Sequence, residues 1–77
     1  MNYDLAIMAL EGLGKSPLML RVDGNDITIE GSQASFKELA RLCLLMGSPE
    51  TSSEEIIELQ PGVHLQNDSS GLRLRIR

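Results

Sequence analysis

The sequence predicts a single α+β domain over residues 1–77, in which a mostly antiparallel sheet of four to five strands packs on one main helix, with a short helix at the N-terminus. Three observations support this fold class. Apolar and polar residues alternate in several short segments, as they do in half-buried strands. Apolar residues recur with a helical period in one longer segment. Turn-forming residues such as Asp23-Gly24-Asn25 and Pro61-Gly62 separate these segments.

The chain begins with an uninterrupted apolar run over residues 5–10. We expect a short helix here, capped by Asn2 or Asp4 and ended by one of the nearby glycines, Gly12 or Gly14. A buried strand is the alternative, because the period of a run this short does not distinguish the two. The run is apolar nearly all round, so the segment requires cover on more than one side.

The next two alternating segments predict a hairpin with strands near residues 18–22 and 26–30. Gly24 and its neighbours tolerate the positive φ that a tight hairpin turn requires. In the second strand, Ile27 and Ile29 are expected to face the core, because side chains at alternate positions share one face.

A helix is predicted for residues 33–46, with Ser32 as its N-cap or, one turn later, with a capping box formed by Ser35 and Glu38. Its predicted core-facing residues lie at helical spacing and form one apolar stripe: Phe36, Leu39, Ala40, Cys43 and Met46. With Leu42 and Leu44 included, the apolar arc covers roughly 200°, about twice what one sheet face needs. Within the stripe, Cys43 is expected to act as a small buried hydrophobe.

Three further strands are predicted near residues 56–60, 63–67 and 72–77, after a polar loop. A turn at Pro61-Gly62 joins the first two, and a turn-rich loop precedes the last. Strand order is left open. Seven apolar residues from the five strands should share the face that packs on the main helix: Leu20, Ile27, Ile29, Leu59, Leu65, Leu74 and Ile76.

Composition limits the possible functions. The formal net charge of −4 argues against nucleic acid as a partner, because phosphate-backbone binding needs clustered Lys and Arg. One Cys and one His cannot form a disulfide within the chain or a four-ligand zinc site, and no cofactor is expected. The apolar run is too short to span a bilayer and lacks the flanks of a signal peptide. We therefore expect a cytoplasmic protein with no membrane partner.

No group of residues in the sequence indicates an enzyme. His64 is the one histidine, and it is expected to face outward from an alternating strand as a surface residue. No nucleophile, paired acid and base, or set of metal ligands accompanies it. The sequence thus predicts a non-catalytic binding protein.

Two segments, IEGSQASFKELARLCLLM and PGVHLQNDSSGLRLRI, resemble an immunity-protein family of bacterial polymorphic toxin systems. In that family, a strand ends in a Gly-Ser or Gly-Asn-Pro type cap, and a helix of the form L-x-x-L-A-x-L-L-L follows. The chain then closes with an H-L strand and a Ser-x-x-Leu-x-Ile strand. The resemblance implies an antidote that binds a cognate toxin and blocks it, with no catalytic residue of its own. The matching residues are Gly31, Ser32, Phe36, Leu39, Ala40, Leu42, Leu44, His64, Leu65, Ser69, Leu72, Leu74 and Ile76.

The partner that the resemblance implies is a protein toxin, and a basic nuclease domain would suit an acidic chain. An acidic surface would steer such a partner electrostatically. The alternative function is a small structural or regulatory subunit of a larger assembly. The candidate partner-binding residues are the acidic side chains that follow the main helix: Glu50, Glu54, Glu55 and Glu58.

A homodimer is also expected. The N-terminal segment, residues 1–14, and the wide arc of the main helix together exceed what one sheet face can cover, and soluble monomers rarely expose large apolar patches. The competing interpretation is that the N-terminal segment covers the domain's own helix and completes a monomeric core. The predicted dimer interface consists of Leu5, Met8, Leu42 and Leu45.

Overall fold

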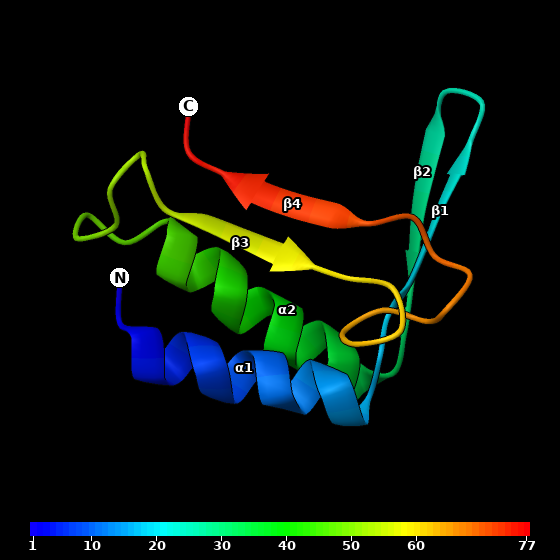
Figure 1. Cartoon of the computed structure of the whole chain (residues 1–77), viewed down its shortest axis with the longest axis horizontal. Helices are drawn as coiled ribbons and strands as arrows, with labels where there is room; N and C mark the ends of the chain where they lie inside the picture. Colours follow the sequence, from blue (N-terminus) through cyan, green and yellow to red (C-terminus); the bar gives the residue numbers. More distant parts are fainter.

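A computed structural model describes all 77 residues as an α+β structure of two helices and two small antiparallel sheets (Figure 1). The two helices lie side by side and run in opposite directions, and the first hairpin extends away from them at one end. Neither helix is long and apolar enough to cross a membrane. In chain order the elements are α1 (Tyr3–Lys15), β1 (Met19–Asp23), β2 (Asp26–Glu30), α2 (Gln33–Met46), β3 (Ile56–Leu59) and β4 (Leu72–Arg75).

Helix α1 is capped by Asn2, whose side-chain oxygen accepts a hydrogen bond from the backbone N–H of Leu5 at 3.2 Å. This bond satisfies one of the N–H groups that a first helical turn leaves without a partner. The expectation that the helix ends at Gly12 or Gly14 is wrong, because it continues to Lys15. Neither glycine takes the positive φ that is typical of a residue just past a helix end.

Helix α2 is capped by Ser32, as predicted. The Ser32 hydroxyl accepts a hydrogen bond from the N–H of Ser35 at 3.1 Å, and the Ser35 hydroxyl accepts one from the N–H of Ser32 at 3.3 Å. The Ser35 hydroxyl also donates to the carbonyl of Ser16 at 2.7 Å. Because Ser35 is buried, this bond both satisfies its hydroxyl and ties the start of α2 to the end of α1.

The strands form two separate two-stranded sheets, β1 with β2 and β3 with β4, in place of the single sheet of four to five strands expected from the sequence. The strand predicted at residues 63–67 is absent. The carbonyl of Gln60 instead accepts hydrogen bonds from the N–H groups of residues 63–65, which closes a tight turn. Gly62 supplies the positive φ of 82° within this turn.

The core is one cluster of eight buried apolar residues, contributed by both helices, β3 and the adjoining loops: Ala6, Ala9, Leu13, Leu18, Leu42, Ile57, Leu59 and Leu65. Ile27 was expected to face this core, but 69% of it is exposed, because the tip of the β1–β2 hairpin extends beyond the helices (Figure 1). The other six strand residues predicted to face the core are buried or half-buried: Leu20, Ile29, Leu59, Leu65, Leu74 and Ile76.

Helix α2 is rotated relative to the predicted orientation, so a different set of residues faces the core. The assignment of Leu42 to a dimer interface is wrong, because Leu42 is fully buried in the core of the single chain. Phe36 and Cys43, predicted to face the core, are exposed. An arc as wide as that of α2 does not define one inward direction. The buried hydroxyl of Ser35, which lies on the same side of the helix as Leu42, sets that direction instead.

We predict that Leu42→Ala lowers the free energy of unfolding by about 2–5 kcal/mol, because truncation of a fully buried leucine leaves a cavity. The matched control is Cys43→Ala at the next position of the same helix. Its side chain is exposed, so the change should stay within about 0.5 kcal/mol. Urea unfolding followed by circular dichroism measures both, and equal destabilisation by the two substitutions would contradict this orientation of α2.

Candidate functional site

A groove of about 500 Å³ lies between α1 and α2 and is open to solvent. Residues three or four positions apart share one side of a helix, so Leu5 and Met8 form the α1 wall, whereas Arg41, Leu44 and Leu45 form the α2 wall. Five of the six lining residues are apolar: Leu5, Met8, Ala9, Leu44 and Leu45.

The groove walls expose large apolar side chains to water. Leu44 is 76% exposed and Met8 is 61% exposed. On α2 the exposed apolar residues continue beyond the groove along the side that faces away from the core. We call the exposed apolar residues of the groove walls and of the adjoining side of α2 the helical apolar surface: Leu5, Met8, Phe36, Ala40, Cys43 and Leu44.

One ion pair borders the groove. The guanidinium of Arg41 contacts the carboxylate of Glu38, one turn earlier in α2, at 2.7 Å. The Glu38 side chain is only 12% exposed and packs closely against Gly12 of α1. A Cβ atom on residue 12 would overlap the Glu38 side chain. Gly12 therefore permits the close approach of the two helices, and Glu38 holds Arg41 at the edge of the groove.

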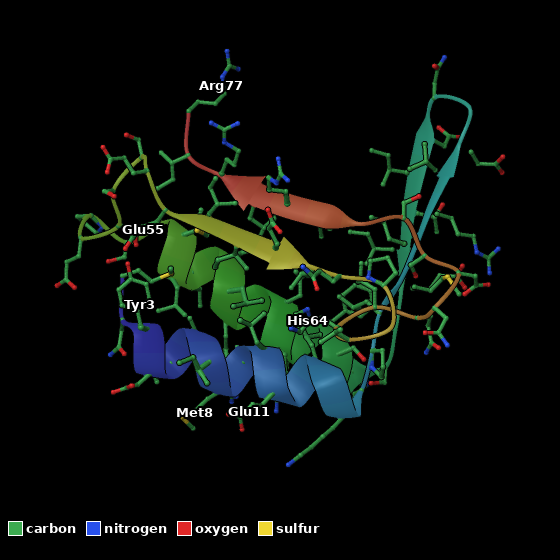
Figure 2. The ribbon with its side chains drawn as sticks, viewed as in Figure 1. Tyr3, Met8, Glu11, Glu55, His64 and Arg77 are labelled. Carbon is green, nitrogen blue, oxygen red and sulfur yellow. The ribbon has the colours of Figure 1, made fainter.

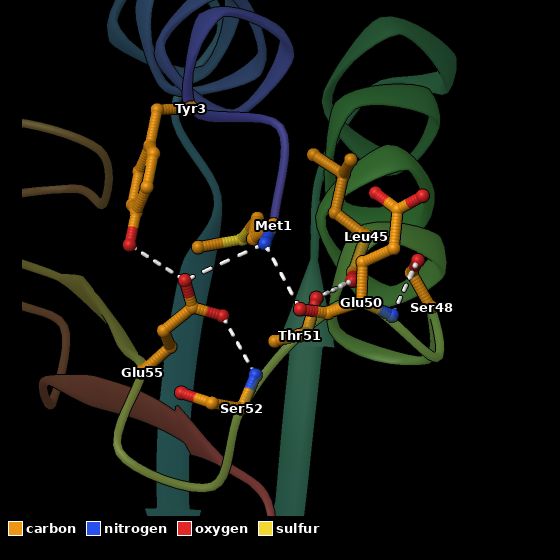
Figure 3. Close-up of polar contacts among 8 residues, drawn as sticks. All are labelled: Met1, Tyr3, Leu45, Ser48, Glu50, Thr51, Ser52 and Glu55. Atoms are coloured by element: carbon orange, nitrogen blue, oxygen red, sulfur yellow. Dashed lines mark hydrogen bonds and ion pairs between the residues drawn. The ribbon is translucent and has the colours of Figure 1, made fainter.

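The loop after α2 is anchored to the start of α1 through Glu55 (Figure 3). Its Oε1 accepts a hydrogen bond from the Tyr3 hydroxyl at 2.6 Å and lies 3.5 Å from the α-ammonium group of Met1. Its Oε2 accepts a hydrogen bond from the N–H of Ser52 at 3.0 Å. The bond from Tyr3 is the main cause that lowers the pKa of Glu55 below its ordinary value, and the same bond raises the pKa of Tyr3.

The four glutamates predicted to bind a partner do not form one group. Glu50 and Glu54 are exposed on the loop, and their carboxylates have no hydrogen-bond or ion-pair partner. The Glu55 side chain is 15% exposed and is occupied by the anchoring contacts. Glu58 lies on β3 and pairs with Arg73 of β4 at 3.1 Å. The loop thus offers two free carboxylates rather than four.

His64 is half-buried in the turn after β3, rather than facing outward from a strand as predicted (Figure 2). Its Nδ1 accepts a hydrogen bond from the N–H of Gln60 at 3.2 Å. Burial lowers the pKa of His64, which favours the neutral ring that can accept this bond. No three His, Cys, Asp or Glu side chains come together as metal ligands would.

A second hollow of about 310 Å³ lies beside β3 and β4 where the two strands meet the adjoining loops. The Glu58–Arg73 ion pair forms part of its lining, so the two opposite charges offset each other there. Only two of its seven lining residues are apolar. We regard the groove between the helices as the stronger candidate for a binding site, because apolar lining is typical of such sites.

No protein-family model matches the chain, and comparisons with curated proteins and with solved structures found no match. The candidate site is therefore defined by its geometry alone.

The structure brings together three of the four residues predicted for an oligomer interface, because Leu5, Met8 and Leu45 all line the groove. Sequence reasoning missed Arg41 as a groove residue and did not assign Leu44 to the interface. The signal was present in their spacing, since Arg41 precedes Leu44 by three positions and Leu45 by four and so shares their side of the helix.

The anchoring of Glu55 predicts a stability that depends on pH. Folding lowers the pKa of this carboxyl below its ordinary value of 4.5, so the folded state binds fewer protons. The stabilisation is therefore present above about pH 4.5 and is lost as the pH falls through the folded-state pKa. We predict that Glu55→Gln lowers the urea midpoint at neutral pH, and that its difference from the wild type disappears once the pH has fallen below the folded-state pKa.

The control for this experiment is Glu54→Gln, which removes an exposed carboxylate without a partner and should leave the midpoint unchanged at every pH. A deficit of Glu55→Gln that stays constant on acidification would show that the carboxylate charge does not anchor the loop.

Proposed function

We propose that this chain is a non-catalytic protein-binding module that acts in the cytoplasm as an immunity protein and neutralises a cognate bacterial toxin. The observation that carries the binding role is the helical apolar surface. Leu44 and Met8 are more than half exposed there, and removal of apolar surface from water is the main source of affinity between proteins. The chain's own core leaves this surface uncovered, so a docked partner would gain from burying it.

The toxin contact is assigned to the loop that follows α2. Glu50 and Glu54 present free carboxylates on this loop. The path of the loop is held by the Thr51 hydroxyl, which donates to the carbonyl of Leu45 at 2.7 Å, and by Glu55, which binds α1 (Figure 3). An acidic loop with a fixed path, on a chain of net charge −4, is suited to bind a toxin that has a basic cleft, such as a nuclease domain. Opposite charges on the two proteins accelerate their association.

The groove between α1 and α2 is assigned to a second copy of this chain. A two-fold interface brings the same residues of both copies together, so each apolar groove covers the other. Leu5, Met8 and Leu45 line the groove, and the exposed Leu44 takes the place of the buried Leu42. A homodimer would thereby bury apolar side chains that a thin monomeric core leaves in water.

A second candidate function is a small structural or regulatory subunit of a larger assembly. The exposed stripe on α2 favours it, because Phe36 and Cys43 lie outside the groove and offer apolar surface to a further partner. In that role the chain would bind its assembly and would not protect cells from a toxin.

We predict that sedimentation equilibrium finds a dimer at a concentration of about 100 μM. Leu44→Glu should give a folded monomer, because the interface would otherwise bury a charge without a partner. The matched control is Val63→Glu, at a half-exposed position in the turn after β3, which should stay dimeric. A wild-type chain that remains monomeric at this concentration would rule out the dimer.

We predict that a neighbouring gene encodes a toxin with a basic domain, and that co-expression of this chain rescues cells from that toxin. The double variant Glu50→Lys and Glu54→Lys should weaken the toxin complex by about tenfold or more, mainly through slower association. The control, Glu11→Lys with Asp68→Lys, changes the net charge equally at exposed positions elsewhere and should still protect. Failure of the wild-type chain to rescue cells would reject the immunity role.

A further inference from the structure

The β1–β2 hairpin has a projecting tip with little support from the rest of the molecule (Figures 1 and 2). Residues 21–28 are all exposed. Gly24 has a φ of 63° at the first central position of the two-residue turn, and the turn sets Asp23 opposite Asp26. Two-stranded hairpins are marginally stable in isolation, so an exposed one is a candidate for pairing with another chain.

The register of the hairpin determines which backbone groups point outward. In a two-residue hairpin the pair that flanks the turn exchanges both hydrogen bonds, and alternate pairs follow. The backbone N–H and C=O groups of Leu20 and Val22 therefore point away from β2. Leu20 shows this directly, because its N–H bonds the Ser69 hydroxyl and its carbonyl accepts from the N–H of Ser70, each at 3.0 Å.

The same alternation leaves the outer edge of β2 free. Ile27 and Ile29 direct their N–H and C=O groups away from β1, and no other part of the chain forms a hydrogen bond with them. An edge strand with such unpaired groups is a template for an added strand. The edge of β1, by contrast, is covered near its base by Ser69 and Ser70.

The side chains beside this edge differ between the two faces of the hairpin. On one face Ile27 pairs with Val22, and both are more than half exposed. On the other face β2 carries Asp26, Thr28 and Glu30. Glu30 contacts Arg21 at 3.1 Å, but both side chains are more than half exposed, so this ion pair is weak and its carboxylate stays accessible.

We propose that the outer edge of β2 binds an extended segment of a partner protein as an added strand. Its apolar residues would lie beside Ile27 and Ile29, and its basic residues would lie beside Asp26 and Glu30. Backbone hydrogen bonds supply affinity in this mode of recognition, and alternate side chains supply specificity. The inference rests on the proposed protein-binding function and adds the chemistry of the segment that is bound.

A second copy of the chain fits this edge poorly. Antiparallel pairing of β2 with itself over its full length would set Asp26 opposite Glu30, and like charges directly opposite are destabilising. The basic strand β4 of a second copy is also occupied. Leu72 and Leu74 are half-buried against their own core, and Arg73 pairs with Glu58. The alternation of basic and apolar residues therefore has to come from another protein.

The experiment titrates the isotope-labelled full chain with an acetylated and amidated peptide of sequence Lys-Val-Thr-Val-Lys. We expect the backbone amide resonances of Ile27 and Ile29 to shift and their solvent exchange to slow. A peptide with both lysines replaced by glutamate tests charge, and a peptide N-methylated at both valines tests the backbone bonds. Each of these two modified peptides should bind at least about tenfold more weakly than the original peptide.

Two variants of the protein test the edge itself. Ile27→Pro removes an N–H that points to solvent, so the hairpin should keep its own hydrogen bonds and lose the peptide. Val22→Pro makes the same change on the opposite edge, that of β1, and should keep the peptide. The amide spectrum away from the hairpin checks that both variants are folded.

Equal binding of the N-methylated peptide, or unchanged binding by Ile27→Pro, would overturn the added-strand proposal. Shifts of Ile27 that depend on protein concentration without peptide would identify a second copy as the occupant and would also overturn it. A chain that protects cells from its toxin but does not bind the peptide would refute the edge site alone. A chain that binds the peptide but gives no protection would refute only the immunity role.

Discussion

The close packing of α1 on α2 is the constraint on which the rest of the structure depends. Ala6 and Ala9 present only methyl groups to this contact, so Leu42 of α2 can reach the interior and become fully buried. Ile57 and Leu59 of β3 complete the same cluster. Because eight apolar residues form the core of a 77-residue chain, an element that loses contact with this cluster has no second one to join.

A core this small leaves apolar surface elsewhere. Each helix turns one side to the core, yet its other sides also carry apolar residues. Among these, Met8 of α1 and Leu44 of α2 line the groove and are exposed. The β1–β2 hairpin is held at its base by Leu20, which is buried and bonded to Ser69, whereas its tip has no cover. The groove between the helices and the edge of the hairpin are thus both exposed because the small core does not cover them.

Elements that depend on neighbouring residues were predictable from the sequence. The N-cap at Ser32 needs only a hydrogen bond to Ser35, three positions later, and the structure confirms it. Long-range contacts were not predictable. Residues 63–67 alternate like a strand, but the Gln60 carbonyl accepts hydrogen bonds from their first N–H groups. The only pairing with a distant segment is a single bridge between Leu65 and Leu18, which is too short to form a strand. The orientation of α2 depends on a hydrogen bond from the Ser35 hydroxyl to the carbonyl of Ser16, 19 residues earlier in the chain. The hydropathy pattern of the sequence contains no information about such a bond.

The two surfaces rest on different physical groups, which decides how far the sequence could reveal them. The groove depends on side-chain area, so the surplus of apolar residues in both helices already indicated it. The edge of β2 depends on backbone groups that every residue has, and only the absence of a neighbouring strand exposes them. Those backbone groups accept an extended strand of almost any sequence, so discrimination between partners falls to Asp26 and Glu30.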